Sequence, residues 1–280
     1  MFERIFKLSE HKTTVKTEVM AGITTFMTMA YILAVNPSVL GSTGMDTTAV
    51  LLATALASCL GTLCMAFMAN LPFALSAGMG LNAFMAYTVV AGYGYSWQVA
   101  LLAVFIEGLI FIVLSLTNVR EAIFNAIPLT LKKGVSVGIG LFIAFIGLQN
   151  SGLCVDSATL VGIISFPENF HTAGICALLT LIGLFFTAVF YTRKMKGAIL
   201  YGILLTWILG MICQVTGIYV PTPDAGFYSL FPSWGMTDFS KLSLTFGQCF
   251  NVDFSAVGIV NFIVVIFSFL FVDIFDTLGT

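Results

Sequence analysis

Eight predominantly apolar runs of about 20 residues follow one another along the chain. They cover residues 18–36, 48–69, 73–92, 96–117, 133–150, 172–192, 197–217 and 256–280. Only 9% of the residues are charged, whereas a soluble domain carries about 25%. Lipid offers no hydrogen bonds to the backbone, so each run must be helical or buried in protein. The sequence therefore predicts an all-α polytopic membrane protein.

The basic residues indicate how these spans are oriented. With eight alternating spans, all of the eleven Lys and Arg residues except Lys241 fall on the same side as the N-terminus. The positive-inside rule makes that side cytoplasmic. We therefore expect a multi-pass protein of the cell membrane with residues 1–17 as a cytoplasmic tail. The stretch 118–131 is predicted to be an interfacial amphipathic helix or, equally, a plain basic loop.

The loops on the other side carry acidic residues and few basic ones. The segment 218–255 is rich in aromatic residues and proline, and we expect it to form a small structured cap. The six cysteines form no CxxC pair and are expected to be small hydrophobic side chains. Cys154 and Cys249 both fall in outside loops, which leaves a disulfide open. Because no metal constellation, catalytic triad or phosphate loop appears, we expect no metal, no cofactor and no nucleic-acid partner.

The third apolar run is unusual for a membrane helix. Between Pro72 and Phe84 it contains Gly78, Gly80 and Asn82. Glycines that interrupt such a run indicate a broken helix near the bilayer midplane, whose free backbone N–H groups can meet a ligand. The Asn82 amide, a donor and an acceptor at once, would suit the edge of a base. The alternative is a small-residue packing face with Asn82 as an interhelical hydrogen-bonding residue.

Three carboxylates lie within the predicted spans, where each is costly. Asp273 and Asp276 are three residues apart and share a helix face. Two adjacent carboxyls cannot both ionise cheaply at low dielectric, so one is expected to gain and lose a proton. The alternative is a protonated acid that is hydrogen-bonded to a neighbouring backbone group. Glu107 either bonds across helices or takes part in a proton path.

The first span contains Thr24, Thr25 and Thr28 and then Asn36-Pro37. Because threonine hydroxyls often bond the preceding turn, packing is the favoured role for any one of them. Thr25 is nevertheless kept as a candidate ligand contact. Asn36-Pro37 is expected to end the helix.

Three motifs together resemble the hypoxanthine/adenine/guanine permease branch of the nucleobase–cation symporters. They are Gly22–Tyr31 with Asn36-Pro37, Gly78–Phe84 and Asp273–Thr280. The resemblance implies fourteen spans in two inverted repeats of seven, of which only about the first eight are present. It assigns 18–117 (spans 1–4) and 256–280 (span 8) to a core domain, 118–217 to a gate domain, and 218–255 to an extracellular loop. The chain stops inside an apolar run, so we expect a fragment that lacks the binding acid of the tenth span.

The resemblance further implies import of hypoxanthine, guanine and adenine by proton symport, with a homodimer suggested by fold analogy. Asp273 would bind the purine and exchange the proton, Asp276 would support it, and Asn82 would be a polar contact. Gly80 and Thr25 complete the expected substrate site, and Glu107 the proton path.

Two other functions were weighed. The same fold could carry xanthine, uracil or an anion, although two carboxylates repel anions. A non-transporting scaffold or an intramembrane enzyme is the alternative of a different class. An enzyme would need a nucleophile–base pair or metal ligands within the spans, and only carboxylates are found there. We therefore predict that the chain is not an enzyme.

Overall fold

A computed structural model describes residues 6–10, 12–117, 119–158, 160–195, 197–223, 226–232, 235, 237–252 and 257–279. The side chains of residues 120, 121, 124 and 276–279 are not among those described. The chain divides into two compact units. Unit 1 comprises Met1–Val15, Met29–Ile143 and Thr237–Thr280, and unit 2 comprises Lys16–Thr28 and Ala144–Met236.

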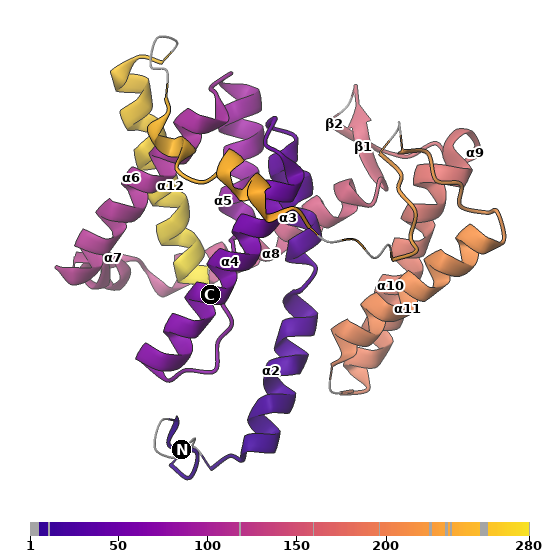
Figure 1. The fold of residues 1–280 in the computed structure, drawn as a ribbon, viewed down its shortest axis with the longest axis horizontal. Helices are drawn as coiled ribbons and strands as arrows, with labels where there is room; N and C mark the ends of the chain where they lie inside the picture. The colour runs from indigo at the N-terminus through magenta and orange to yellow at the C-terminus, as the bar shows by residue number, and fades with distance from the viewer. Residues whose placement is uncertain are drawn as a thin grey trace. The chain divides into compact units, whose positions relative to one another are not determined.

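The helices of unit 1 come from two separate parts of the sequence, Met29–Ile143 and Thr237–Thr280 (Figure 1). Its main elements are α3 (Ile32–Gly41), α4 (Thr47–Cys64) with its π-helical extension η1 (Met65–Ala69), α5 (Met79–Ala83) with its π-helical extension η2 (Phe84–Gly92), α6 (Trp97–Leu116), α7 (Val119–Ala126) and α12 (Ile259–Gly279). Two short 3-10 helices, η5 (Phe239–Leu244) and η6 (Gln248–Phe250), precede α12. The helix α8 (Leu129–Asn150) begins in this unit and continues into unit 2.

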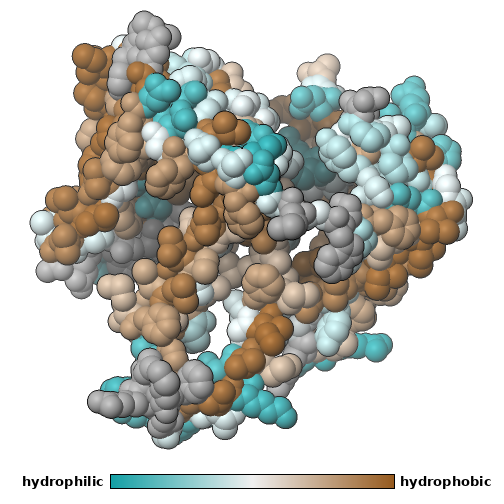
Figure 2. All heavy atoms as spheres, in the orientation of Figure 1, coloured by the Kyte–Doolittle hydropathy of each residue, from teal (hydrophilic) through white to brown (hydrophobic). Residues whose placement is uncertain are grey.

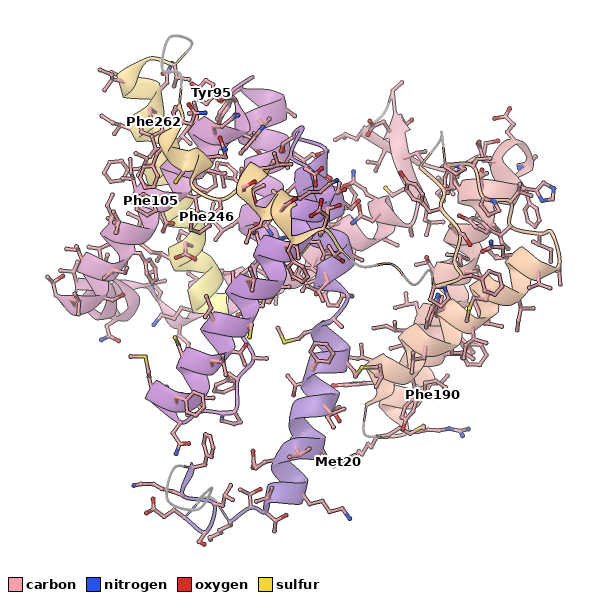
Figure 3. All side chains as sticks on the ribbon, in the orientation of Figure 1. Met20, Tyr95, Phe105, Phe190, Phe246 and Phe262 are labelled. Carbon is pink, nitrogen blue, oxygen red and sulfur yellow. The ribbon has the colours of Figure 1, made fainter. Side chains whose placement is uncertain are left out.

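The apolar core of unit 1 lies where α6, η2 and α12 pack together. Phe269 of α12 is fully buried and meets Phe84 edge-on, with ring centroids 5.0 Å apart. Phe262, labelled in Figure 3, belongs to the same core. Phe105 of α6 makes a second edge-on contact with Phe250 of η6, at 5.4 Å. Aromatic contacts thus join α12 and the segment before it to the N-terminal helices of this unit.

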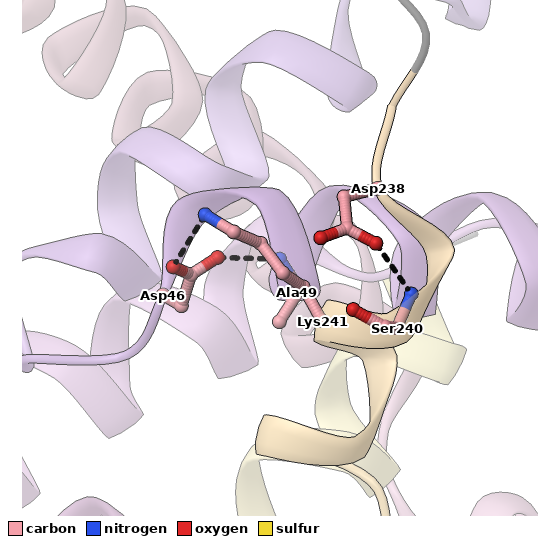
Figure 4. A network of polar contacts seen from close by, with 5 residues as sticks. All are labelled: Asp46, Ala49, Asp238, Ser240 and Lys241. Carbon is pink, nitrogen blue, oxygen red and sulfur yellow. Dashed lines mark hydrogen bonds and ion pairs between the residues drawn. The ribbon is translucent and has the colours of Figure 1, made fainter.

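A polar network joins the segment before α12 to the start of α4 (Figure 4). Asp46 caps α4 by accepting a hydrogen bond from the backbone N–H of Ala49 at 2.9 Å. Its other carboxylate oxygen lies 3.3 Å from Nζ of Lys241, and Asp238 caps η5 through the N–H of Ser240. The Ala49 N–H and then Lys241 hold the pKa of Asp46 below its ordinary value.

Unit 2 contains most of α2 (Val15–Met29) and the C-terminal part of α8, and then a short antiparallel hairpin, β1 (Cys154–Ser157) and β2 (Leu160–Ile163). Its remaining helices are α9 (Phe166–Asn169), the π-helical η3 (Phe170–Gly174), α10 (Ile175–Thr192) and α11 (Ala198–Val215). The hairpin lies within a segment where the sequence predicted only a loop.

The helices α10 and α11 pack closely because each places a glycine under a threonine of the other. A Cβ added to Gly183 would overlap the Thr206 hydroxyl, and one added to Gly202 would overlap the Thr187 hydroxyl. Each hydroxyl donates within its own helix, from Thr187 to the Gly183 carbonyl and from Thr206 to the Gly202 carbonyl. Any larger residue at these two positions would force the helices apart, so the close packing requires glycine at both.

The chain after α11 folds back on this pair. Trp207 Nε1 donates to the Leu230 carbonyl at 2.9 Å, and the Leu230 N–H donates to Gln214 Oε1 at 2.8 Å. The hydroxyl of the buried Tyr219 donates to the Tyr228 carbonyl at 2.7 Å. These bonds order the first part of the predicted cap.

Among the residues that the structure describes, six helices are long and apolar enough to cross a membrane by length and composition. They cover Val15–Gly41, Thr47–Ala69, Trp97–Leu116, Leu129–Asn150, Phe166–Thr192 and Ala198–Val215. The third and eighth predicted runs correspond to shorter apolar helices, Met79–Gly92 and Ile259–Phe275. Figure 2 shows hydrophobic residues along the outer faces of helices. The prediction of an all-α polytopic membrane protein is confirmed, apart from the small hairpin.

Three local expectations can be compared with the structure. Asn36-Pro37 does not end a helix, because both residues lie inside α3 and the turn falls earlier, at Ala30–Tyr31. A proline displaces the carbonyl four residues before it, and neighbouring helices in a membrane can satisfy the freed groups. The stretch 118–131 is helical over Val119–Ala126. All six cysteines are free thiols in the structure, and Cys154 and Cys249 belong to different units.

Candidate functional site

The third apolar run is broken, as its glycines predicted. Residues 70–78 form neither helix nor strand, and a helix begins only at Met79. Asn70 starts this segment with a left-handed backbone (φ 52°), and Gly78 ends it in an extended conformation (φ −74°, ψ 124°). Gly80 does not lie at the break itself, because it is in the first turn of α5. A Cβ added to Gly80 would meet nothing within 4 Å, so there is open space beside the helix start.

The extended segment is held against one face of α4. Ser58 and Thr62 are four residues apart and therefore share a helix face. The Ser58 and Ser76 hydroxyls lie 2.8 Å apart, and the Leu75 N–H donates to Thr62 Oγ1 at 3.0 Å. These side chains satisfy backbone and hydroxyl groups that a broken helix leaves without intrahelical partners.

A third residue of this face, Thr54, begins a chain of hydrogen bonds that reaches the start of α5. Asn36 of α3 donates through Nδ2 to Thr54 Oγ1 at 2.6 Å, and Asn82 donates through Nδ2 to Asn36 Oδ1. Asn36 and Thr54 are buried, and Asn82 is half-buried. Asn82 therefore bonds across helices, as the alternative interpretation proposed, while none of the described residues donates to its Oδ1. The amide retains one acceptor for a ligand.

The second polar feature of unit 1 is a pair of acids from two different helices. Glu107 of α6 is 5% exposed, and its Oε1 has no hydrogen-bond partner among the described residues. Asp273 of α12 is half-buried. It follows Phe269 by one turn, on the face of α12 that packs against α6. Asp273 and Glu107 thus lie on two helices that pack against each other, whereas the sequence predicted Glu107 as a single acid of its span.

The two remaining predicted residues are Asp276 and Thr25. The side chain of Asp276 lies outside the described part of the structure, although its backbone is in α12. Thr25 belongs to unit 2, and its hydroxyl donates to the Ala21 carbonyl of its own helix at 2.9 Å. Its neighbours Thr24 and Thr28 also bond carbonyls of α2. These bonds match the packing role favoured for the three threonines.

The residues that support the site lie outside those predicted from the sequence. Asn36 is expected there to end a helix, and Thr54 and Ser58 are not among the candidate residues. The four-residue spacing of Thr54, Ser58 and Thr62 in an apolar helix was the available signal. In the part of the chain that the structure describes, no group of three His, Cys, Asp or Glu side chains could hold a metal ion.

Comparison of the sequence with known proteins shows the family to which the chain belongs. The model of the Permease family matches residues 16–280. Guanine/hypoxanthine permease PbuG of Bacillus subtilis is 42% identical over 285 residues, with 98% of this chain and 60% of the relative covered. Adenine permease AdeP of Escherichia coli is 39% identical over 285 residues, with 100% of this chain and 58% of the relative covered.

Guanine/hypoxanthine permease PbuO of Bacillus subtilis is 40% identical over 282 residues, with 99% of this chain and 60% of the relative covered. The chain thus spans about three fifths of the length of these relatives. All three are permeases by name, in agreement with the prediction that the chain is not an enzyme. The match extends over nearly the whole chain, and the chain therefore belongs to the Permease family, in the branch of the nucleobase–cation symporters that includes adenine and guanine/hypoxanthine permeases.

Proposed function

We propose that this chain is the N-terminal part of a secondary active transporter that imports purine nucleobases by proton symport. The observation that carries the proposal is the position of two membrane acids, Glu107 and Asp273, on two helices that pack against each other in the unit that also contains the broken third run. The named activities of the relatives, transport of adenine and of guanine or hypoxanthine, support purines as the cargo.

The roles follow from the chemistry of these groups. An ionised Asp273 accepts a hydrogen bond from a purine ring N–H, and charge-assisted bonds of this kind are stronger than neutral ones. Two carboxyls that face one another in low dielectric cannot both be charged at low cost, so one of them holds a proton. A purine that binds to ionised Asp273 then requires that the proton be held elsewhere than on Asp273. Binding of the purine and movement of the proton are thereby linked, which couples purine transport to proton transport.

The start of α5 supplies the second side of the site. Its first backbone N–H groups carry the positive end of the helix dipole. The Asn82 Oδ1 offers an acceptor, and the open space beside Gly80 gives a flat ring room to approach. Asp276 supports Asp273 one turn on, and Thr25 remains a proposed contact.

The wider organisation proposed for the protein follows the family resemblance. Residues 18–117 and 256–280 belong to a core domain, 118–217 to a gate domain and 218–255 to an extracellular loop, in a fold of seven plus seven spans. The side on which the basic residues fall supports a cytoplasmic N-terminus, and the cell membrane is the proposed location. A homodimer is the assembly proposed by analogy of fold.

Substitution of Asp273 tests this proposal in the full-length protein. We expect Asp273→Asn to abolish uptake of labelled hypoxanthine, because the amide can neither ionise nor exchange the proton. The matched control is Ser268→Ala on the same helix, since the Ser268 hydroxyl bonds its own Val264 carbonyl. Uptake by Asp273→Asn with unchanged affinity would remove this residue from the site.

The coupling ion is tested separately in the wild-type protein. We expect accumulation of hypoxanthine to stop when the proton gradient is collapsed with an uncoupler. Accumulation that continues without the gradient but requires sodium would replace the proton by sodium as the coupling ion. Failure of every purine to compete for uptake would instead reject purines as the cargo.

A further inference from the structure

The hydrogen-bond chain from Thr54 through Asn36 to Asn82 has a direction. Asn36 Nδ2 donates to Thr54 Oγ1, so its Oδ1 is turned toward α5 and accepts from Asn82 Nδ2. That direction turns the Oδ1 of Asn82, an acceptor, away from Asn36, while Nδ2 keeps its second N–H on the side of Asn36. Whether a ligand meets the oxygen or the nitrogen of the Asn82 amide is therefore decided by Thr54, at the other end of the hydrogen-bond chain.

Each member of the chain is able to reverse. A hydroxyl both donates and accepts, and a primary amide carries a donor end and an acceptor end of nearly the same shape. In the reversed chain Thr54 would donate to Asn36 Oδ1, Asn36 Nδ2 would donate to Asn82 Oδ1, and Asn82 would present N–H donors. The two directions thus offer opposite hydrogen-bonding groups in the same place.

The surroundings of Asn36 make this chain costly to leave incomplete. Asn36 is 3% exposed and Thr54 is 6% exposed, so a polar atom that loses its partner there cannot turn to water. The α3 helix packs against both α4 and α5, which fixes the three side chains relative to one another. A change at Thr54 is therefore expected to pass to Asn82 through Asn36.

We propose that Asn36 and Thr54 are positioning residues that set the polarity of the Asn82 amide and, through it, which purine hydrogen-bonding pattern the site accepts. The proposal rests on the proposed function, in which Asn82 meets the substrate. In the observed direction the site offers an acceptor, which selects a purine with an N–H at that position. Purines suit such a selection because adenine and hypoxanthine exchange donor and acceptor at positions 1 and 6.

The test compares Thr54→Val with Thr54→Ser in the full-length protein. Valine matches the shape of threonine but lacks the hydroxyl, whereas serine keeps it. Inhibition of labelled hypoxanthine uptake is measured with adenine and with the 3-, 7- and 9-deaza analogues of hypoxanthine, which alter one ring nitrogen each. In Thr54→Val we expect the inhibition constant of at least one competitor, relative to hypoxanthine, to change about 3- to 10-fold. Thr54→Ser is expected to keep all ratios within about twofold.

A second variant acts on the middle of the chain. In Asn36→Ala the Asn82 amide is free to present either its oxygen or its nitrogen. We therefore expect the inhibition constants of the competitors, relative to that of hypoxanthine, to become more nearly equal. The amount of each variant in the membrane is measured in parallel, because a purely structural role lowers that amount and the maximal rate while the ratios stay constant. Constant ratios in Thr54→Val and Asn36→Ala would overturn the proposal. If no purine inhibited the wild type, the proposed function itself would fail instead.

Discussion

The α3–α4–α5 cluster of unit 1 and the α10–α11 pair of unit 2 use similar residues in opposite ways. In the pair, Thr187 and Thr206 donate to carbonyls of their own helices, and glycines let the helices approach. In the cluster, Thr54, Ser58 and Thr62 bond groups on other elements. Where the hydroxyls bond within their own helices, the two helices are held together by close packing. Where the hydroxyls bond to neighbouring elements, they hold an irregular segment in place.

The difference extends to how completely polar groups are satisfied. The two threonine hydroxyls of the α10–α11 pair have partners, whereas buried Glu107, next to the cluster in unit 1, has an oxygen with none among the described residues. An unpaired buried polar atom costs stability, and such groups concentrate where a protein needs them for function. Unit 2 has such an atom too, the Thr222 hydroxyl oxygen, but it lies outside this pair. The α10–α11 pair is thus closed by packing, while Glu107 retains an oxygen that a ligand or a proton can use.

The largest effect is expected from filling a glycine in the α10–α11 pair. Gly202→Val places side-chain atoms where the Thr187 hydroxyl lies, so the helices must separate. We expect a loss of about 3 kcal/mol in the free energy of unfolding, measured on the solubilised protein. Gly138→Val in α8 is the control, because a Cβ there meets nothing within 4 Å. Equal losses in both variants would show that close packing is not what distinguishes this pair.

A substitution at Glu107 is expected to act in the opposite direction. Glu107→Met replaces a buried carboxyl by an apolar side chain of similar length, which removes the unpaired oxygen. We expect a gain of about 1–3 kcal/mol in the free energy of unfolding together with loss of proton-driven purine uptake. A variant that is less stable and still transports would contradict the view that unit 1 retains this acid for function.

The bond between Ser58 and Ser76 should contribute less. A double-mutant cycle with Ser58→Ala and Ser76→Ala measures their coupling energy, which we expect to be about 0.6 kcal/mol, as for other side-chain bonds inside membranes. Thr187→Ala combined with Ser58→Ala serves as the control cycle, since those hydroxyls bond different partners. A zero coupling between the two serines would mean that α4 does not hold the extended segment through this contact.

The smallest effect is expected at the exposed cap of α4. The Ala49 N–H and Lys241 lower the pKa of Asp46, so its carboxylate stabilises the fold above its ordinary pKa, and this contribution is lost as the pH falls through the lowered value. Asp46→Asn keeps a good capping residue without the charge. We expect the variant to have a slightly lower melting temperature at neutral pH and a weaker acid dependence, checked by thermal unfolding between pH 7 and pH 3. An unchanged acid dependence would remove Asp46 from the groups that cause it.

Much of the architecture followed from residue types alone. Hydrophobic length and the scarcity of charge located the six helices that are long enough to cross a membrane, because lipid selects for both along each helix. The break before Met79 was predicted from the glycines that interrupt the third apolar run. Asn36-Pro37 was misjudged as a helix end for a related reason, since the local rule for proline is overridden when neighbouring helices satisfy the chain.

The sequence by itself predicted a polytopic membrane protein that resembles a permease family, with a broken third span and acids within its helices. Only the tertiary structure decided that the helices of Asp273 and Glu107 pack against each other and that Asn82 is held by Asn36 and Thr54. Composition and spacing describe what one helix can do, because they depend on neighbours along the chain. The partner of a buried polar group is set by which helices pack together, and that depends on the whole fold.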